Sequence, residues 1–124
     1  MIKVSVATDD GTTVSQHFGQ ALYFKIYTLE NGDVAAVEMR DKAHHSHADH
    51  TQEQVQGIHP GQLMVEAMSD CQVLICGGMG MPAYDRAINA GIQVFLTNES
   101  SIEAAIKAYQ SGKLVSEPGL IHHH

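Results

Sequence analysis

Residues 72–82 read QVLICGGMGMP, and this stretch indicates the fold more clearly than any other part of the chain. Its first half, Gln72 to Cys76, contains a short apolar run of the kind found in a buried strand. A glycine-rich loop follows. Pro82, which fits the first turn of a helix, then opens a helix that runs to about Ala90 and stops at Gly91. The stretch therefore predicts a strand–loop–helix unit of an α/β protein.

Three strand-like runs come before this unit. Residues 2–8 alternate apolar and polar side chains and end at Asp9. The runs 22–29 and 34–40 flank Asn31-Gly32, a dipeptide typical of two-residue hairpin turns. We therefore expect a first strand followed by an antiparallel hairpin.

The remaining elements are two helices and one strand. A helix is indicated by Pro60 and an apolar stripe made up of Leu63, Met64, Ala67 and Met68. Ile92 to Thr97 is expected to be the fifth strand. Ser100 and Glu103 form the Ser-x-x-Glu pattern of a capping box for a last helix, which ends at residues 111–113. The order β-β-β-α-β-α-β-α predicts a mixed five-stranded sheet with helices packed over it.

The buried character of the strand at 72–76 favours a parallel pairing with the strand at 2–8. The carboxyl ends of two such strands open on the same edge of the sheet, and ligands of open α/β sheets bind at that edge. We therefore expect the loop that contains His17 to face the loop Gly77–Gly80.

Length, composition and charge narrow the class of protein. The chain has 124 residues with 44% hydrophobic side chains, so we expect one soluble domain over 1–112 and a tail over 113–124. The terminal histidines, His122 to His124, resemble a purification tag and enter no functional argument. A net charge of −7 and no Lys/Arg cluster argue against nucleic acid, and no apolar run approaches the ~20 residues that span a bilayer. The expected location is the cytoplasm.

The only cysteines are Cys71 and Cys76. In an extended chain their odd spacing places the two side chains on opposite faces, too far apart for a disulfide. We therefore expect two free thiols, which fit a reducing compartment, with Cys71 buried as a small apolar residue.

Histidine is the overrepresented residue, with nine copies. Residues 41–59 have no apolar period and hold five of them, so the segment is either functional or disordered. Nitrogen ligands with few thiols suit Zn, Ni or Cu, so this segment is a candidate divalent-metal site through His44, His45, His47 and His50. The other reading is a polar loop with incidental histidines.

The loop Gly77–Gly80 is a candidate anion site. Glycine amides and a helix N-terminus together favour an anion, although the glycines also fit a tight turn with no ligand. His17 lies on a loop aimed at the same edge, where a neutral imidazole can bind a metal or donate to an anion.

Four motifs together resemble the dinitrogenase iron-molybdenum cofactor biosynthesis family over about residues 1–112. They are Thr8-Asp9, Ser15-Gln16-His17-Phe18-Gly19, the run from Gly77-Gly78-Met79-Gly80-Met81 to Pro82-Ala83-Tyr84, and Ala90-Gly91-Ile92 followed by Val94-Phe95 and Thr97. The resemblance implies a ribonuclease H-like, three-layer α/β/α fold with a five-stranded mixed sheet.

The resemblance also implies a function. Members of the family carry preformed metal-sulfur clusters without catalysing a reaction and exchange them with cluster donor or acceptor proteins. The implied cargo is a molybdenum-containing cluster, either an iron-molybdenum cofactor precursor or a molybdenum-copper sulfide. His17 is implicated in holding it, and the full candidate site is His17, Phe18, Gly19, Gly77, Gly78, Met79, Gly80 and Met81. Glycine amides, imidazole and soft methionine contacts would bind such an anion in an exchangeable way.

Two other functions stay open at this point. The first is divalent-metal binding through the histidine-rich segment. The second is a nuclease, which would need two metals held by several inward carboxylates. The first strand supplies no carboxylate, which leaves only Asp9 and Asp10 in the loop that follows. The sequence does not decide the oligomeric state.

Overall fold

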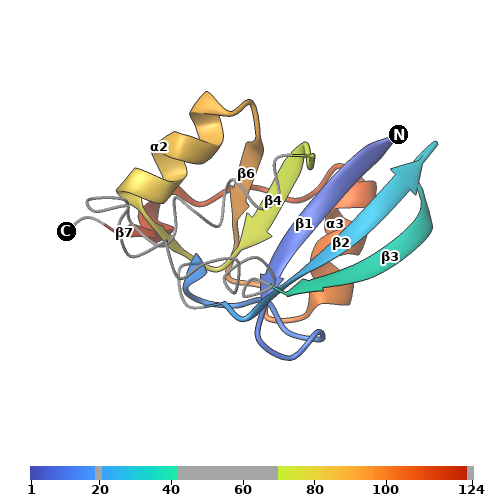
Figure 1. Cartoon of the computed structure of the whole chain (residues 1–124), viewed down its shortest axis with the longest axis horizontal. Helices are drawn as coiled ribbons and strands as arrows, with labels where there is room; N and C mark the ends of the chain where they lie inside the picture. Colours follow the sequence, from blue (N-terminus) through green and yellow to red (C-terminus); the bar gives the residue numbers. More distant parts are fainter. Residues whose placement is uncertain (19–20, 42–69, 123–124) are drawn as a thin grey trace, which may run out of the picture.

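A computed structural model describes residues 1–18, 21–41 and 70–122 of the chain. Its centre is a five-stranded mixed sheet with the strand order β3-β2-β1-β4-β6 (Figure 1). The bounds are Ile2–Thr8 for β1, Tyr23–Glu30 for β2, Asp33–Asp41 for β3, Val73–Cys76 for β4 and Gln93–Leu96 for β6. The five predicted strands are all present, with ends that differ by no more than a residue or so from those expected.

The hairpin between β2 and β3 is confirmed. Asn31 and Gly32 have φ of 56° and 87°, both in the left-handed region that a type I′ turn requires. The two strands pair antiparallel from Glu30 opposite Asp33 to Tyr23 opposite Asp41.

The parallel pairing of β1 with β4 is also confirmed, with Val4, Ser5 and Val6 opposite Val73, Leu74 and Ile75. β6 pairs parallel with the other side of β4. The carboxyl ends of three neighbouring strands therefore meet at one edge of the sheet.

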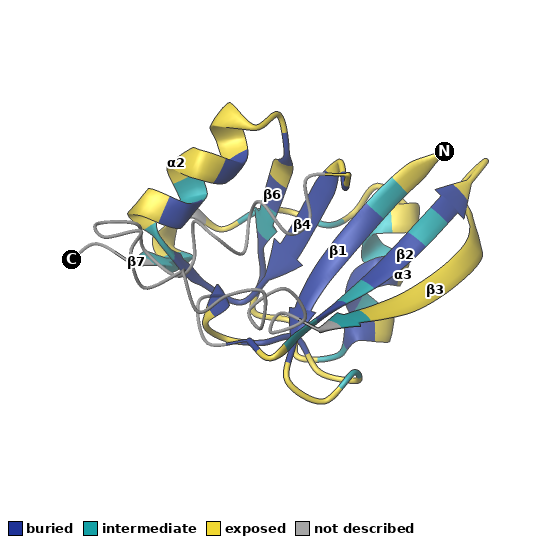
Figure 2. Cartoon of the chain, viewed as in Figure 1, coloured by how far each residue is buried: buried dark blue, intermediate teal, exposed yellow. Residues whose placement is uncertain are grey.

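A helix covers each face of the sheet, which confirms the three-layer architecture. The helix α2 (Met81–Asn89) packs with Ala83 and Ala87 on a core cluster that includes Phe24 and Leu74. The helix α3 (Ile102–Gln110) packs on the other face against Val4, Val6 and Ile75. Both clusters are dark in Figure 2, and β1 is buried without a break from Val4 to Thr8 because its side chains pack alternately against the two covered faces of the sheet. No helix in the described ranges is long and apolar enough to cross a membrane.

The helix ends agree with the sequence except at the start of α3. Gly91 follows α2 with a φ of 84° and Gly112 follows α3 with 73°, so both stops are confirmed. The expected capping box at Ser100 is wrong by one residue, because Ser101 is the N-cap and its side chain accepts from Ala104 N at 3.2 Å. Ser100 instead accepts the Val14 N–H through its carbonyl in the contact with the first loop.

Cys71 and Cys76 are free, as expected, and both are buried, which the sequence predicts for Cys71 only. They do not lie on opposite faces, however: both belong to the core cluster under α2. The alternation of β4 begins at Val73, and Cys71 precedes it, so the strand period does not extend to that residue.

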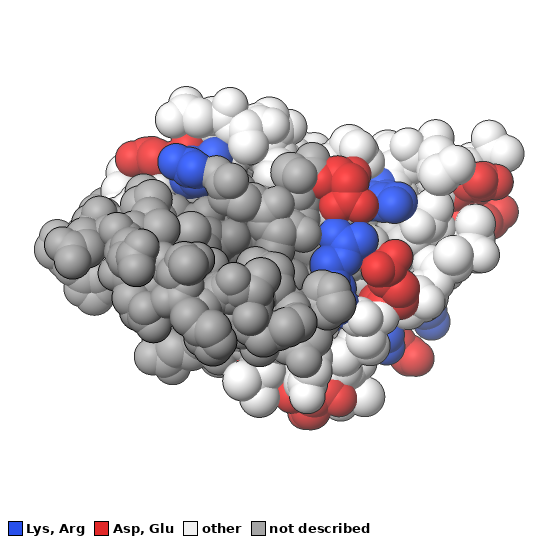
Figure 3. Space-filling view, in the orientation of Figure 1, with Lys and Arg blue, Asp and Glu red and all other residues white. Residues whose placement is uncertain are grey.

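A charged cluster joins the first part of the chain to the part after residue 69. Arg40 Nη1 and Nη2 lie 2.8 and 3.2 Å from the Asp70 carboxylate, and Lys3 Nζ lies 3.2 Å from the same group. Glu38 also contacts Arg40 at 3.2 Å. Figure 3 shows acidic and basic side chains side by side on this face.

Residues 113–122, which are predicted to be a tail, run back along the domain. Glu117 N donates to Leu96 O at 2.8 Å, and Leu96 N donates to Ser116 Oγ at 3.1 Å. A 3-10 turn, η4 (Pro118–Leu120), leads into β7 (Ile121–His122), which pairs parallel with β5 (Met79–Gly80). The helix expected after Pro60 and, apart from Asp41, the histidine-rich segment 41–59 lie outside the described residues.

Candidate functional site

Three loops meet at the carboxyl edge of the sheet, following β1, β4 and β6. The loop after β1 contacts the start of α3, where Val14 N donates to Ser100 O at 2.8 Å and Ile102 N to Thr12 O at 3.0 Å. Its next residues contact the loop after β4. The expected ligand edge is therefore built from one continuous loop that touches both of its neighbours.

The His17 loop and the glycine loop face each other, as predicted. Gly77 N donates to Ser15 O at 2.7 Å, and Phe18 N donates to Gly78 O at 2.8 Å. A Cβ on Gly77 would lie 2.8 Å from Ser15 O and 2.9 Å from Gln16 Cα, closer than side chains approach backbone atoms. Glycine is thus a steric requirement at this position.

His17 is exposed, and contacts of Ser15 and Phe18 hold the backbone around it. Ser15 Oγ donates to His17 O at 3.1 Å and lies 3.3 Å from His17 N. Phe18 is fully buried, with its ring centroid 5.7 Å from that of Phe24. The buried phenyl ring of Phe18 therefore anchors the loop next to the exposed His17.

The two methionines of the loop have different environments. Met79 is 1% exposed and belongs to the core cluster under α2, whereas Met81 is 36% exposed. Met81 is therefore the methionine with a thioether at the surface, and Met79 supports the loop from below.

The first turn of α2 is a candidate anion site. Its N-cap is Gly80, no side chain caps it within the part of the chain that the structure describes, and no acidic residue occupies the first turn. The first amide groups of a helix lack partners inside the helix and carry a partial positive charge. A bound anion would satisfy both.

Both cysteine thiols are unsuited to metal ligation in this conformation. Burial raises the pKa of Cys76 to about 12, and a hydrogen bond to the Gly78 backbone offsets this only in part. Burial likewise raises the pKa of Cys71 to about 12. Because both pKa values are raised so far, both sulfurs stay protonated at neutral pH. The thiolate is the form that binds a metal.

The carboxylates after β1 hold the loop together. Asp10 accepts hydrogen bonds from Thr12 N at 2.9 Å and Thr13 N at 2.8 Å, and its pKa is lowered, chiefly by the Thr13 amide. Asp9 Oδ1 accepts from Leu22 N at 3.1 Å. Across residues 1–18, 21–41 and 70–122 no three His, Cys, Asp or Glu side chains come together as a metal site. Of the predicted positions, Gly19, His44, His45, His47 and His50 fall outside those ranges.

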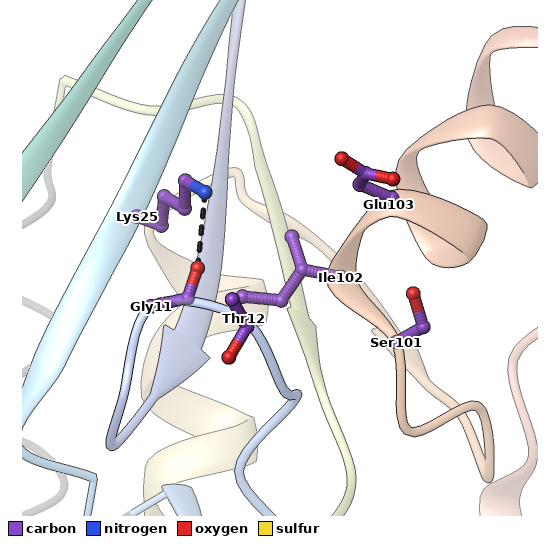
Figure 4. Close-up of a pocket in the computed structure, with 6 residues that line it drawn as sticks. All are labelled: Gly11, Thr12, Lys25, Ser101, Ile102 and Glu103. Carbon is purple, nitrogen blue, oxygen red and sulfur yellow. Dashed lines mark hydrogen bonds between the residues drawn. The ribbon is translucent and has the colours of Figure 1, made fainter.

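A shallow pocket of about 270 Å³ lies at the same edge, next to α3 (Figure 4). Its lining comes from Gly11 and Thr12, from Lys25 on β2, and from Ser101, Ile102 and Glu103 at the start of α3. Lys25 Nζ donates to Gly11 O across it at 3.0 Å. None of the predicted site residues lines this pocket, and no sequence motif marked it.

Comparison with protein families gives one match that covers most of the chain. A family model described as dinitrogenase iron-molybdenum cofactor matches residues 1–112. Among curated relatives, an uncharacterized protein of Methanocaldococcus jannaschii is 25% identical over 114 residues, which is 92% of this chain and 90% of that protein. NifX of Sinorhizobium fredii is 29% identical over 101 residues, 79% of this chain but only 61% of NifX.

Solved structures share the fold. The apo form of the orange protein from Desulfovibrio gigas superposes with a TM-score of 0.72 at 21% identity, covering 95% of this chain and 94% of that one. At that identity the likeness establishes the architecture of the sheet and its helices.

Proposed function

The chain belongs to the dinitrogenase iron-molybdenum cofactor family, and from this membership we propose that it binds and carries a preformed metal-sulfur cluster without transforming it. The proposed cargo is molybdenum-containing, of the iron-molybdenum precursor or molybdenum-copper sulfide type. The description of the family names an iron-molybdenum cofactor, which supports molybdenum as a metal of the cargo. NifX, which is similar to this chain over 79% of its length, is a second support.

The observation that carries the proposal is the N-terminus of α2 beside the His17 loop. Among the residues that the structure describes, no side chain caps this helix. The glycine loop that leads into it is hydrogen-bonded to residues 15 and 18, on either side of His17. The proposed site is made up of His17, Phe18, Gly19, Gly77, Gly78, Met79, Gly80 and Met81. In it, His17 and Met81 contact the cargo, while Phe18 and Met79 anchor the loops from the core.

The chemistry of these groups fits an exchangeable anion. Metal-sulfide clusters are anionic, so helix amides favour them, and an imidazole and a thioether provide nitrogen and soft sulfur contacts. The thiols stay protonated, so no fixed thiolate bond opposes release. A net charge of −7 also disfavours tight binding of an anion. We propose that the protein receives the cluster from a donor and passes it to an acceptor in the reducing cytoplasm.

The test is anaerobic loading of the purified protein with tetrathiomolybdate, with and without Cu(I), followed by gel filtration. We expect a visible chromophore and molybdenum to co-elute with the protein, and His17→Ala to lose most of both. Cys76→Ala is the matched control and should keep the chromophore. Equal retention by wild type and His17→Ala would contradict the assignment of the site, and loss only in Cys76→Ala would indicate thiolate ligation instead.

The second function that the sequence suggests is divalent-metal binding through His44, His45, His47 and His50. Replacing these four residues with alanine should abolish Ni, Zn or Cu binding and leave cluster loading intact if the two activities are separate. Protein isolated from its native host with stoichiometric divalent metal and no sulfide would overturn cluster carriage.

A further inference from the structure

The strand β3 forms one edge of the sheet, and no described strand pairs with its outer side. It is the last strand in the order β3-β2-β1-β4-β6, and within the described ranges only β2 pairs with it. Every side chain from Asp33 to Met39 is exposed, and Figure 2 shows the strand exposed along almost its whole length. An unpaired edge presents a row of backbone N–H and C=O groups to any strand that can reach it.

Of the devices that usually protect an edge strand, β3 has charged side chains and one irregularity in its pairing, and it lacks two others. β3 contains neither lysine nor proline. The only irregularity in its pairing with β2 lies between Thr28 and Leu29, near the hairpin turn. From Ala36 to Asp41 the strand is regular and suited to pairing.

The two faces of this regular stretch differ in character. On the face shared with α3, Val37 and Met39 are 48% and 47% exposed, and they lie opposite Tyr27 and Lys25. On the other face, Glu38 and Arg40 carry opposite charges and lie 3.2 Å apart within the chain, and Arg40 also contacts Asp70 at 2.8 Å. A partner strand would therefore need apolar side chains on the first face and charges complementary to Glu38 and Arg40 on the second.

We propose that the partner of this edge is a second copy of the same chain, paired β3 to β3 in antiparallel orientation with the two-fold axis at Met39. In this register Glu38 of each copy lies opposite Arg40 of the other, which extends the Glu38–Arg40 pair within each copy into a network of four alternating charges across the two strands. Neighbouring registers lack these opposite-charge contacts. An axis at Glu38 or at Arg40 places two like charges directly opposite each other. An axis at Val37 places Glu38 opposite Ala36. Opposite charges directly across a sheet are stabilising and like charges are destabilising, so the charges select one register.

The same register buries the apolar side. The two Met39 side chains meet on the axis with Val37 of each copy diagonal to them, which removes half-exposed apolar surface from water. The five-stranded sheets of the two copies become continuous. The net charge of −7 on each copy opposes association. At physiological ionic strength the Debye length is about 8 Å, so charges far from the joint are screened while the interface pairs act at contact. The result is a weak, concentration-dependent dimer.

Cysteine cross-linking tests the register. Residues directly opposite in an antiparallel pair have Cα atoms about 4.5 to 5.5 Å apart, within disulfide range, so Met39→Cys should form a disulfide-linked dimer on mild oxidation. Ala36→Cys is the matched control on the same strand. Its two copies would lie about 20 Å apart and should stay monomeric on a non-reducing gel. The native cysteines are buried and do not interfere. Equal cross-linking of both variants, or of neither, overturns the register.

Sedimentation velocity on the full chain, from micromolar to millimolar concentration, tests the charges. Wild type should shift from monomer to dimer, and Glu38→Lys should weaken the dimer by at least about tenfold. Asp85→Lys, on an exposed position of α2, makes the same change in net charge and should dimerise at least as well as wild type. A wild type that stays monomeric throughout, or equal behaviour of the two variants, overturns the proposal. None of these outcomes bears on cluster loading, which is measured separately.

Discussion

At the scale of single residues, Gly77 sets how closely the two loops of the candidate site approach. Its amide donates to Ser15 O, and the same carbonyl oxygen would clash with any Cβ at this position. By contrast, Gly80 has a φ of −74°, which any residue can adopt. A Cβ at this position would lie 3.7 Å from Pro82 Cδ, an ordinary van der Waals contact. Two glycines of one loop are therefore present for different reasons.

We predict that Gly77→Ala destabilises the protein by about 1 to 3 kcal/mol, because backbone atoms of residues 15 and 16 must move to admit the methyl group. It should also weaken loading with tetrathiomolybdate, since the His17 loop is displaced. Urea unfolding gives the free energy, and gel filtration gives the loading. Gly80→Ala is the control and should cost well below 1 kcal/mol; a larger loss there than at Gly77 would contradict the steric argument.

At the scale of elements, α3 shows how a contact elsewhere selects between two caps allowed by the sequence. Ser100 and Ser101 are both good N-cap residues. Ser100 O accepts from Val14 N, Ser101 N donates to Glu99 Oε2, and Ile102 enters the core at 1% exposure. These contacts start the helix at Ile102 and leave Ser101 as the cap.

Ser101→Ala is accordingly expected to lower the free energy of unfolding by about 1 kcal/mol, through loss of the bond to Ala104 N. Ser100→Ala should be close to neutral, because only its backbone is engaged. Thermal and urea unfolding of both variants measure the difference. The reverse ranking would show that the cap lies where the Ser-x-x-Glu pattern placed it.

The pairing of Arg40 with Asp70 joins β3 to the segment that enters β4. Hydrogen bonds from Arg40 lower the pKa of the Asp70 carboxyl, with a further contribution from Lys3. A carboxyl with a lowered folded-state pKa stabilises the protein above the unfolded value of about 4. That stabilisation is lost as pH falls through the folded pKa.

Replacement of Asp70 by Asn should therefore reduce stability at pH 7 and flatten the loss of stability on acidification below about pH 4. The side chain of Asp70 is 46% exposed, so the effect at pH 7 should be at most about 1 kcal/mol. Urea unfolding at pH 7 and at pH 3 provides the measurement. A difference between wild type and Asp70→Asn that stayed constant over this range would contradict the assigned role.

At the scale of the whole molecule, local patterns predicted the sheet well. The alternation in residues 2–8, the Asn31-Gly32 turn and the glycine stops at 91 and 112 are short-range signals, and each one is confirmed. The facing of the His17 and Gly77 loops also followed from the sequence, since parallel β1 and β4 leave their carboxyl ends on one edge.

Local patterns do not predict features that depend on contacts between distant segments of the chain. The pairing of Met79 with Ile121 joins residues far apart in the sequence through a two-residue strand, which is too short to show a period. The different exposures of Met79 and Met81 depend on how the loop enters α2. The shared environment of Cys71 and Cys76 depends on where the alternation of β4 begins.

The sequence by itself determined the order and type of the five sheet strands and of the helices α2 and α3, and it determined the family, because these follow from local periodicity, turn chemistry and motifs. Only the tertiary structure decided which groups at the ligand edge are available. Burial raises the pKa of the thiols and takes the Met79 side chain away from the surface. Among the described residues, no side chain caps the N-terminus of α2, and no strand pairs with the outer side of β3. The reason is physical: exposure, pKa and pairing are set by neighbours brought together from across the chain.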